Sequence, residues 1–138
     1  MQKKKLFFAG IVLCLVVAVT GFYLYQKPRA SLDDIPPAYT LDAAGLYNSF
    51  QQNEKKANEQ YVGKVLLVKG TVDNVQVTDS TISVQLSSGN DMGGINCSVA
   101  KGKNNKNNLP SKGSLVQVKG RCVGFLMDVN LVDALIEQ

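Results

Sequence analysis

The sequence predicts a mainly β protein, in which a five-stranded barrel follows one packed helix and an apolar N-terminal helix. Three observations lead to this prediction. Residues 6–25 contain no charged side chain, and apolar residues then recur at helical spacing across residues 41–60. From about residue 62 the spacing changes to the alternation typical of strands. The 138 residues are therefore expected to divide into a membrane segment and one small domain.

The apolar segment has the length of a transmembrane helix. At about 1.5 Å per residue, residues 6–25 span about 30 Å, the thickness of the hydrocarbon core of a bilayer. Residues 1–5 form a basic tail with three lysines, which the positive-inside rule places in the cytoplasm. We therefore expect a single-pass protein of the bacterial inner membrane with its C-terminal domain in the periplasm. A cleaved secretory signal is the alternative, although its apolar core is shorter, about 7–15 residues.

Residues 26–40 are expected to form a linker. They contain three prolines and no apolar periodicity, which is typical of an extended spacer. The part of the chain beyond the membrane segment holds 12 of the 15 Lys/Arg residues and all 11 Asp/Glu residues, so its net charge is +1. A nearly neutral domain lacks the positive charge that a nucleic-acid partner favours.

One helix is predicted from about residue 41 to residue 60, with Thr40 as its N-cap. Its apolar side chains recur at steps of three, seven and four residues, which places them on one face. We expect this face to pack in the core of the domain. Its members are Tyr47, Phe50, Ala57 and Tyr61.

Five strands are predicted within the domain of residues 41–138. They cover residues 64–77, 81–86, 95–99, 115–123 and 129–136. The first bends at Gly70, the fifth requires a bulge near residues 132–133, and a polar loop at 101–113 joins the third strand to the fourth. This arrangement is typical of the Greek-key barrel called the OB-fold. A β-sandwich is the alternative, but it usually needs about seven strands.

Two segments resemble a known family. LYNSFQQNEKKANEQYVGKVLLVKGTV (residues 46–72) and VKGRCVGFLMDVNL (residues 118–131) are similar to the bacterial tRNA-anticodon-binding-like OB-fold proteins. The resemblance implies an exported or membrane-anchored protein with a leading helix and an OB barrel over residues 41–136. It implies no established ligand. Many members carry a cysteine on the last strand, where this chain has Ala134, so a family disulfide from Cys122 to that strand lacks its partner here.

The sequence contains no pattern of catalytic residues. It has no histidine, no Cys-x-x-Cys, no phosphate-binding glycine loop and no nucleophile elbow. The loop at residues 87–94 lacks the ligand spacing of a calcium site. We therefore expect no enzymatic activity, no cofactor and no metal.

Cys97 and Cys122 are the cysteines of the exported part, and alternation turns both toward the barrel interior. An oxidising compartment permits a disulfide between them. The alternative is a pair of buried thiols, because the third and fourth strands of an OB barrel are not hydrogen-bonded neighbours and a disulfide needs Cα atoms within about 7 Å.

The outward face of the first three strands is polar and is the expected binding surface. No aromatic residue occurs from residue 62 to residue 124, so this face offers no platform on which bases could stack. We expect a binding module of the cell envelope whose partner is a protein, a glycan or a small polar molecule. Binding of single-stranded nucleic acid or tRNA is the alternative, and an ordinary hydrated surface is a third reading of each residue. The candidate contacts are Lys69, Thr71, Ser83, Gln85 and Asn96, with Lys103 and Lys106 at the rim.

Overall fold

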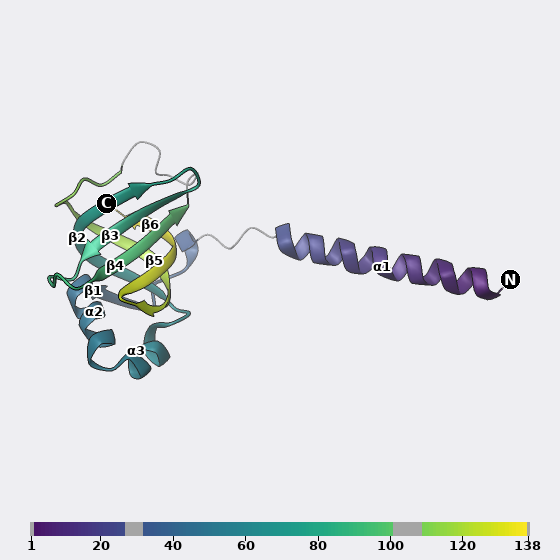
Figure 1. Ribbon diagram of the computed structural model, residues 1–138, viewed down its shortest axis with the longest axis horizontal. Helices are drawn as coiled ribbons and strands as arrows, with labels where there is room; N and C mark the ends of the chain where they lie inside the picture. Colours follow the sequence, from purple (N-terminus) through teal and green to yellow (C-terminus); the bar gives the residue numbers. More distant parts are fainter. Residues whose placement is uncertain (1, 27–31, 101–108, 138) are drawn as a thin grey trace. The chain divides into compact units, whose positions relative to one another are not determined.

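The computed structural model describes residues 2–26, 32–100 and 109–137 (Figure 1). The chain forms two compact units, Met1–Ala30 and Ser31–Gln138. The first contains helix α1 (Gln2–Gln26), so the predicted apolar segment is helical, as expected from an uninterrupted run without proline. The side chains of α1 are described from Gly10 to Tyr25. Within the described residues, no helix meets the length and apolarity required for crossing a membrane.

The second unit is built on a closed barrel, which confirms the predicted five-stranded OB-like arrangement. The sheet order is β1-β2-β3-β4-β6-β5, and β2 also pairs with β5 and closes the barrel. β4 and β6 pair in parallel, whereas the other barrel contacts are antiparallel. The barrel strands are β2 (Val65–Val77), β3 (Thr81–Ser87), β4 (Gly94–Ala100), β5 (Leu115–Leu126) and β6 (Asp128–Glu137).

β2 is long enough to pair with two different barrel strands. Its first half pairs with β5 and its second half pairs with β3. At the bend, a Cβ atom on Gly70 would lie 2.9 Å from the Cβ of Ala43 and 3.2 Å from the Cβ of Leu86. Glycine is therefore required here by close approach, as the sequence predicted.

Two strand irregularities set the register of the barrel. Val72 of β2 lies opposite Leu86 and Asn74 lies opposite Gln85, so Asp73 is the extra residue of a bulge. The bulge that the sequence predicts near residues 132–133 of β6 is confirmed, because the pairing with β5 shifts there and Asp133 has φ 54°.

The prediction of one helix capped by Thr40 is wrong. Thr40 lies in a short strand, β1 (Tyr39–Asp42), that runs parallel to the first half of β2. Asp42 caps α2 (Ala43–Gln52) by accepting a hydrogen bond from Gly45 N at 2.9 Å. Asn53 then ends α2 and caps α3 (Glu54–Tyr61), where its side chain accepts from Lys56 N at 3.0 Å. Local bonds from these two short polar side chains decide where each helix begins.

The predicted core-facing side chains are buried, although they come from two helices. Tyr47 and Phe50 of α2 and Ala57 and Tyr61 of α3 are all at most 5% exposed. Both helices lie at one end of the barrel (Figure 1), where the rings of Phe50 and Phe125 stack with centroids 5.6 Å apart. Their burial enlarges the core of a barrel that is small for independent stability.

The described part of the predicted linker packs against the barrel. The short 3₁₀ helix η1 (Leu32–Asp34) buries the side chain of Leu32. Its Asp33 carbonyl oxygen accepts a hydrogen bond from Nζ of Lys119 at 3.3 Å, and Lys119 is only 6% exposed. Ala38 N donates to the carbonyl of Val65 at 2.7 Å. Residues 27–31 lie outside the described residues, whereas residues 32–40 belong to the folded domain.

Candidate functional site

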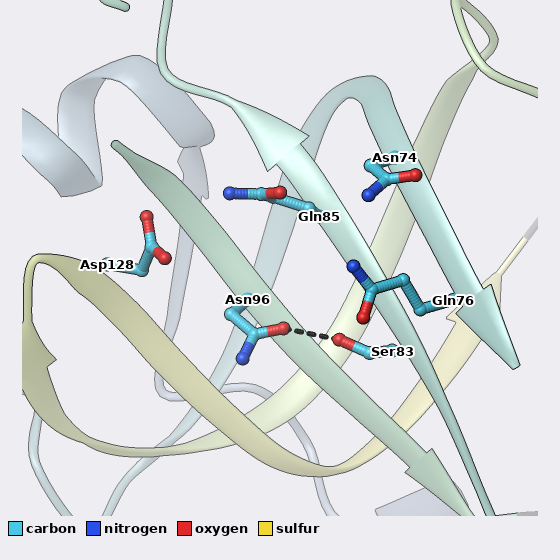
Figure 2. A pocket seen from close by; sticks show the side chains of 6 residues that line it. All are labelled: Asn74, Gln76, Ser83, Gln85, Asn96 and Asp128. Carbon is cyan, nitrogen blue, oxygen red and sulfur yellow. Dashed lines mark hydrogen bonds between the residues drawn. The ribbon is translucent and has the colours of Figure 1, made fainter. Parts of the chain in front are cut away.

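A polar pocket lies on the outer face of β2, β3 and β4, the face on which OB-folds bind their ligands (Figure 2). Its volume is about 170 Å³. The lining consists of four amides, one hydroxyl and one carboxylate: Asn74, Gln76, Ser83, Gln85, Asn96 and Asp128. In Figure 2 Asp128 lies on one side of the pocket, and Asn74 and Gln76 lie on the other.

Strand register brings these side chains together. Asn74 of β2 is paired with Gln85 of β3, which is in turn paired with Asn96 of β4. Asn96 is paired with Asn130 of β6 in the parallel ladder. Because residues opposite each other in neighbouring strands point to the same face, the four amides form one row across the sheet.

Hydrogen bonds hold one end of this row. The hydroxyl of Ser83 donates to Oδ1 of Asn96 at 2.6 Å, and Nδ2 of Asn96 donates to Oδ1 of Asn130 at 3.3 Å. Asp128 accepts a hydrogen bond through Oδ1 from Gly94 N at 2.7 Å. The orientations of the Asn96 amide and the Asp128 carboxylate are therefore set by the protein itself.

The side chains at the other end of the row, Asn74 and Gln85, and that of Gln76 on the next rung make no hydrogen bond within the described residues. Asn74 and Gln76 are exposed, and Gln85 is half-buried. A primary amide offers two donors and one acceptor, so these three residues present unused hydrogen-bonding groups to a ligand.

The pocket has little charge and no aromatic ring. Of the lining side chains only Asp128 is ionisable, and none is a cation. The described aromatic residues of the domain lie in the core or pack against it: Tyr39, Tyr47, Phe50, Tyr61 and Phe125. The pocket can therefore bind through hydrogen bonds, but its lining offers neither base stacking nor an attraction for phosphate.

The structure brings together three of the seven candidate contacts, Ser83, Gln85 and Asn96. Lys69 lies on β2 before the bulge, opposite Gln117 and outside the pocket. Thr71 lines a second pocket. Lys103 and Lys106 lie outside the described residues.

The second pocket, of about 450 Å³, lies where the start of α2 meets residues 87–89 and 112–113. Its main charged feature is the pair formed by Lys112 Nζ and Asp73 Oδ1, which are 3.6 Å apart. Both side chains are more than half exposed, so this pair contributes little to stability. The cation already has a carboxylate partner, which weakens the case for an anion site here.

Asn74, Gln76 and Asp128 are pocket residues that the sequence did not predict. Strict alternation from Thr71 places Asp73 on the outer face, whereas the bulge moves Asn74 and Gln76 there. A signal was present in the sequence. Val75 and Val77 are two residues apart, as alternation requires, whereas Val72 and Val75 are three apart. The longer step indicates one inserted residue between Val72 and Val75.

Cys97 and Cys122 are free thiols and both are fully buried, so the disulfide alternative is not found. Each is paired with the same residue of β6, Leu131, from opposite sides. Two strand spacings separate their Cα atoms by about 9.5 Å, beyond the reach of a disulfide. Burial raises the pKa of the Cys97 thiol to about 12 and also raises that of Cys122, against a smaller lowering by a backbone hydrogen bond at Gly124. Both thiols are therefore protonated and unreactive at neutral pH.

No cluster of three or more potential metal ligands occurs among the described residues. The reactive side chains of the pocket are limited to the Ser83 hydroxyl and the Asp128 carboxylate, and each already makes a hydrogen bond within the protein.

Comparison with known proteins gives one family and a structural neighbour. The model of the tRNA_anti-like family matches residues 1–135. Among solved structures, one described as a "putative nucleic acid-binding lipoprotein" from Klebsiella pneumoniae is similar, with a TM-score of 0.59 and 15% sequence identity. The match covers 82% of this chain and 100% of the other. At this identity the likeness shows a shared fold. None of the curated proteins matches the chain.

Proposed function

Because the chain belongs to the tRNA_anti-like family, we propose that it is a membrane-anchored binding module of the bacterial cell envelope without catalytic activity. Its ligand is held on the outer face of β2, β3 and β4. The observation that carries this proposal is the polar pocket, in which the side chains of Asn74, Gln76 and Gln85 have no hydrogen-bond partner among the described residues. Unpaired amides gathered at the usual ligand face of an OB barrel favour a binding role.

The membrane part of the proposal rests on α1. This helix carries the uncharged residues 6–25 behind three lysines. The positive-inside rule then places Ser31–Gln138 on the periplasmic side. Protease added to spheroplasts that express the full chain should digest this domain while leaving a cytoplasmic marker intact. Protection of the domain would overturn the proposed topology. A mature N-terminus near residue 21 would indicate that the segment is a cleaved signal instead of an anchor.

The binding part of the proposal is tested with the full chain in detergent. Neutral glycan, peptide and small-molecule fractions from cell envelopes are screened for an increase in melting temperature. We expect an active fraction whose effect is lost in Gln85→Ala and kept in Gln117→Ala. Gln117 is a matched control because it is an exposed glutamine on β5 outside the pocket. Equal effects on both variants, or no active fraction, would contradict binding at this face.

Binding of single-stranded nucleic acid or tRNA is the second candidate. The family name and the description of the Klebsiella neighbour favour it. The described lining of the pocket disfavours it, because that lining contains no cation and no aromatic ring. Fluorescence anisotropy with labelled oligonucleotides across a salt series separates the two candidates. Micromolar binding that weakens steeply with salt would favour nucleic acid, since phosphate contacts release counterions.

A further inference from the structure

We propose that the pocket binds a neutral sugar unit of an envelope glycan. This inference rests on the proposed function and names the ligand class of the same site. It follows from four observations: the kind of hydrogen-bonding groups in the pocket, the sign of its charge, the spacing of the groups and the strained backbone just before Asp128.

The hydrogen-bonding groups match those of a sugar. Each sugar hydroxyl both donates and accepts, and each primary amide does the same. Asn74, Gln76 and Gln85 supply three such amides without partners in the described chain. Two neighbouring hydroxyls of a pyranose ring can therefore bond to the oxygen and the nitrogen of one amide. A ligand that only accepts, such as a phosphate, would leave the amide oxygens unpaired.

The charge of the pocket disfavours anions. Its single ionisable lining residue is Asp128, whose Oδ1 already accepts a hydrogen bond from Gly94 N at 2.7 Å. The structure records no hydrogen bond to Oδ2 within the described chain. A carboxylate oxygen accepts strongly from a hydroxyl or an amide N–H but repels a phosphate or a carboxylate.

The spacing of the groups suits sugar rings lying flat on the sheet. The pairs Asn74–Gln85 and Gln76–Ser83 form two successive rungs on the outer face. Two residues along a strand correspond to about 7 Å, so the rungs can contact different hydroxyls of one ring or of two adjoining rings. The pocket is about 170 Å³ and is partly open to solvent, which leaves room for a sugar chain to continue beyond it.

The chain just before Asp128 is exposed and strained. Leu126 and Met127 directly precede Asp128 in the chain and are 83% and 77% exposed. Met127 has a positive φ of 64°, a conformation that costs free energy in a residue other than glycine and is enriched at functional sites. Strain next to a pocket residue supports a functional role for the Asp128 end of the pocket. The ligand that fits the lining residues is a neutral hexose, with or without an N-acetyl group.

The experiment uses the full chain in a detergent without a sugar headgroup, because maltoside or glucoside headgroups would compete. The probes are N,N′,N″-triacetylchitotriose and maltotriose, measured by isothermal titration and by saturation-transfer NMR. We expect saturable binding of at least one probe that changes little between low and high salt, since no ion pair is involved.

Two variants and a control locate the binding. Asn74→Ala and Gln85→Ala should each weaken binding about tenfold, which corresponds to about 1.4 kcal/mol. Gln117→Ala should bind as the unmodified protein does. Melting temperatures of all three variants establish that they are folded, and Asn74 and Gln117 are exposed, so their truncation leaves the core intact.

The outcomes separate this inference from the proposed function. No binding of either probe, or binding that is equal in Gln85→Ala and Gln117→Ala, overturns the sugar proposal. If a peptide fraction or an oligonucleotide binds instead and Gln85→Ala abolishes that binding, the pocket is a binding site for another class of ligand. If neither sugars nor any envelope fraction depends on Gln85, both proposals fall.

Discussion

Asn74 of β2 lies directly opposite Gln85 of β3, on the outer face of the barrel. This pairing exists because Asp73, which lies between Val72 and Asn74, forms a bulge and is left out of the pairing with β3. If Asp73 were a regular strand residue instead of a bulge, alternation from the buried Val72 would turn Asp73 toward the pocket and Asn74 toward the core. The bulge therefore assembles the row of amides, and it does so without altering the pairing of the first half of β2.

The first prediction concerns this bulge. Deletion of Asp73 should destabilise the domain by about 1–3 kcal/mol, because β2 would lose the bend and the added twist of the bulge where its pairing passes from β5 to β3. Asn74 and Gln76 should keep their outward orientation, since regular alternation then follows Val72. Asp73→Asn keeps the chain length and serves as the control; it loses only an exposed ion pair with Lys112, so its change should stay within about 0.5 kcal/mol. Urea unfolding of the full chain measures both. A deletion variant as stable as Asp73→Asn would show that the bulge is not required.

The second prediction concerns the bend of β2. A Cβ on Gly70 would lie 2.9 Å from the Cβ of Ala43 and 3.2 Å from the Cβ of Leu86. Gly70→Val should therefore lower the free energy of unfolding by about 1–3 kcal/mol or more, since neither neighbour can rotate away. The adjacent exposed residue gives the control, Lys69→Ala, with an expected change within about 0.5 kcal/mol. Equal melting temperatures for the two variants would contradict the close packing.

The third prediction tests the conformation of Met127. Its φ of 64° is tolerated by asparagine but opposed by a β-branched side chain. Met127→Val should destabilise the domain by about 1–2 kcal/mol, whereas Met127→Asn should be neutral or slightly stabilising. Since Met127 is 77% exposed, lost packing is a minor part of either effect. The prediction fails if thermal unfolding shows valine to be no worse than asparagine.

The fourth prediction follows from the buried thiols. Burial raises the pKa of Cys97 from 9.0 to about 12, so between these values the unfolded chain releases a proton that the folded chain keeps. The unfolded state then binds fewer protons, and Cys97 lowers stability by up to about 1.4 kcal/mol per pH unit above pH 9. Unfolding in urea from pH 8 to pH 10.5 should show this slope, reduced in Cys97→Ala because the titrating group is gone. Identical slopes in the two proteins would exclude the effect.

The burial of the two thiols can also be tested by their chemical reactivity. In a Cys14→Ser background, the remaining thiols, Cys97 and Cys122, should react with a thiol reagent such as Ellman's only as fast as the domain unfolds. Without reductant, two thiols per chain should still be counted after denaturation, because the strand spacing prevents a disulfide between them. Recovery of fewer than two would indicate a bridge.

Part of this structure was predictable from local sequence patterns. Alternation located the five barrel strands, and the spacing of Tyr47, Phe50, Ala57 and Tyr61 identified the buried face even though Asn53 divides the helix in two. The same patterns placed Ser83, Gln85 and Asn96 on the outer face, where the pocket contains them. These properties are predictable because burial of one side of a strand or helix imposes a period on the residues of that element alone.

Other features were decided only by the tertiary structure. The strand β1 exists because the edge of β2 accepts it, and four residues are too few to show a period of their own. Asn74 and Gln76 joined the pocket through the bulge at Asp73, and Asp128 joined it through the parallel pairing of β6 with β4, a strand distant in the chain. Cys97 and Cys122 share a face but are kept apart by Leu131 between them. Register, bulges and strand order depend on which residues meet across the sheet, and those contacts become defined only when the whole barrel closes.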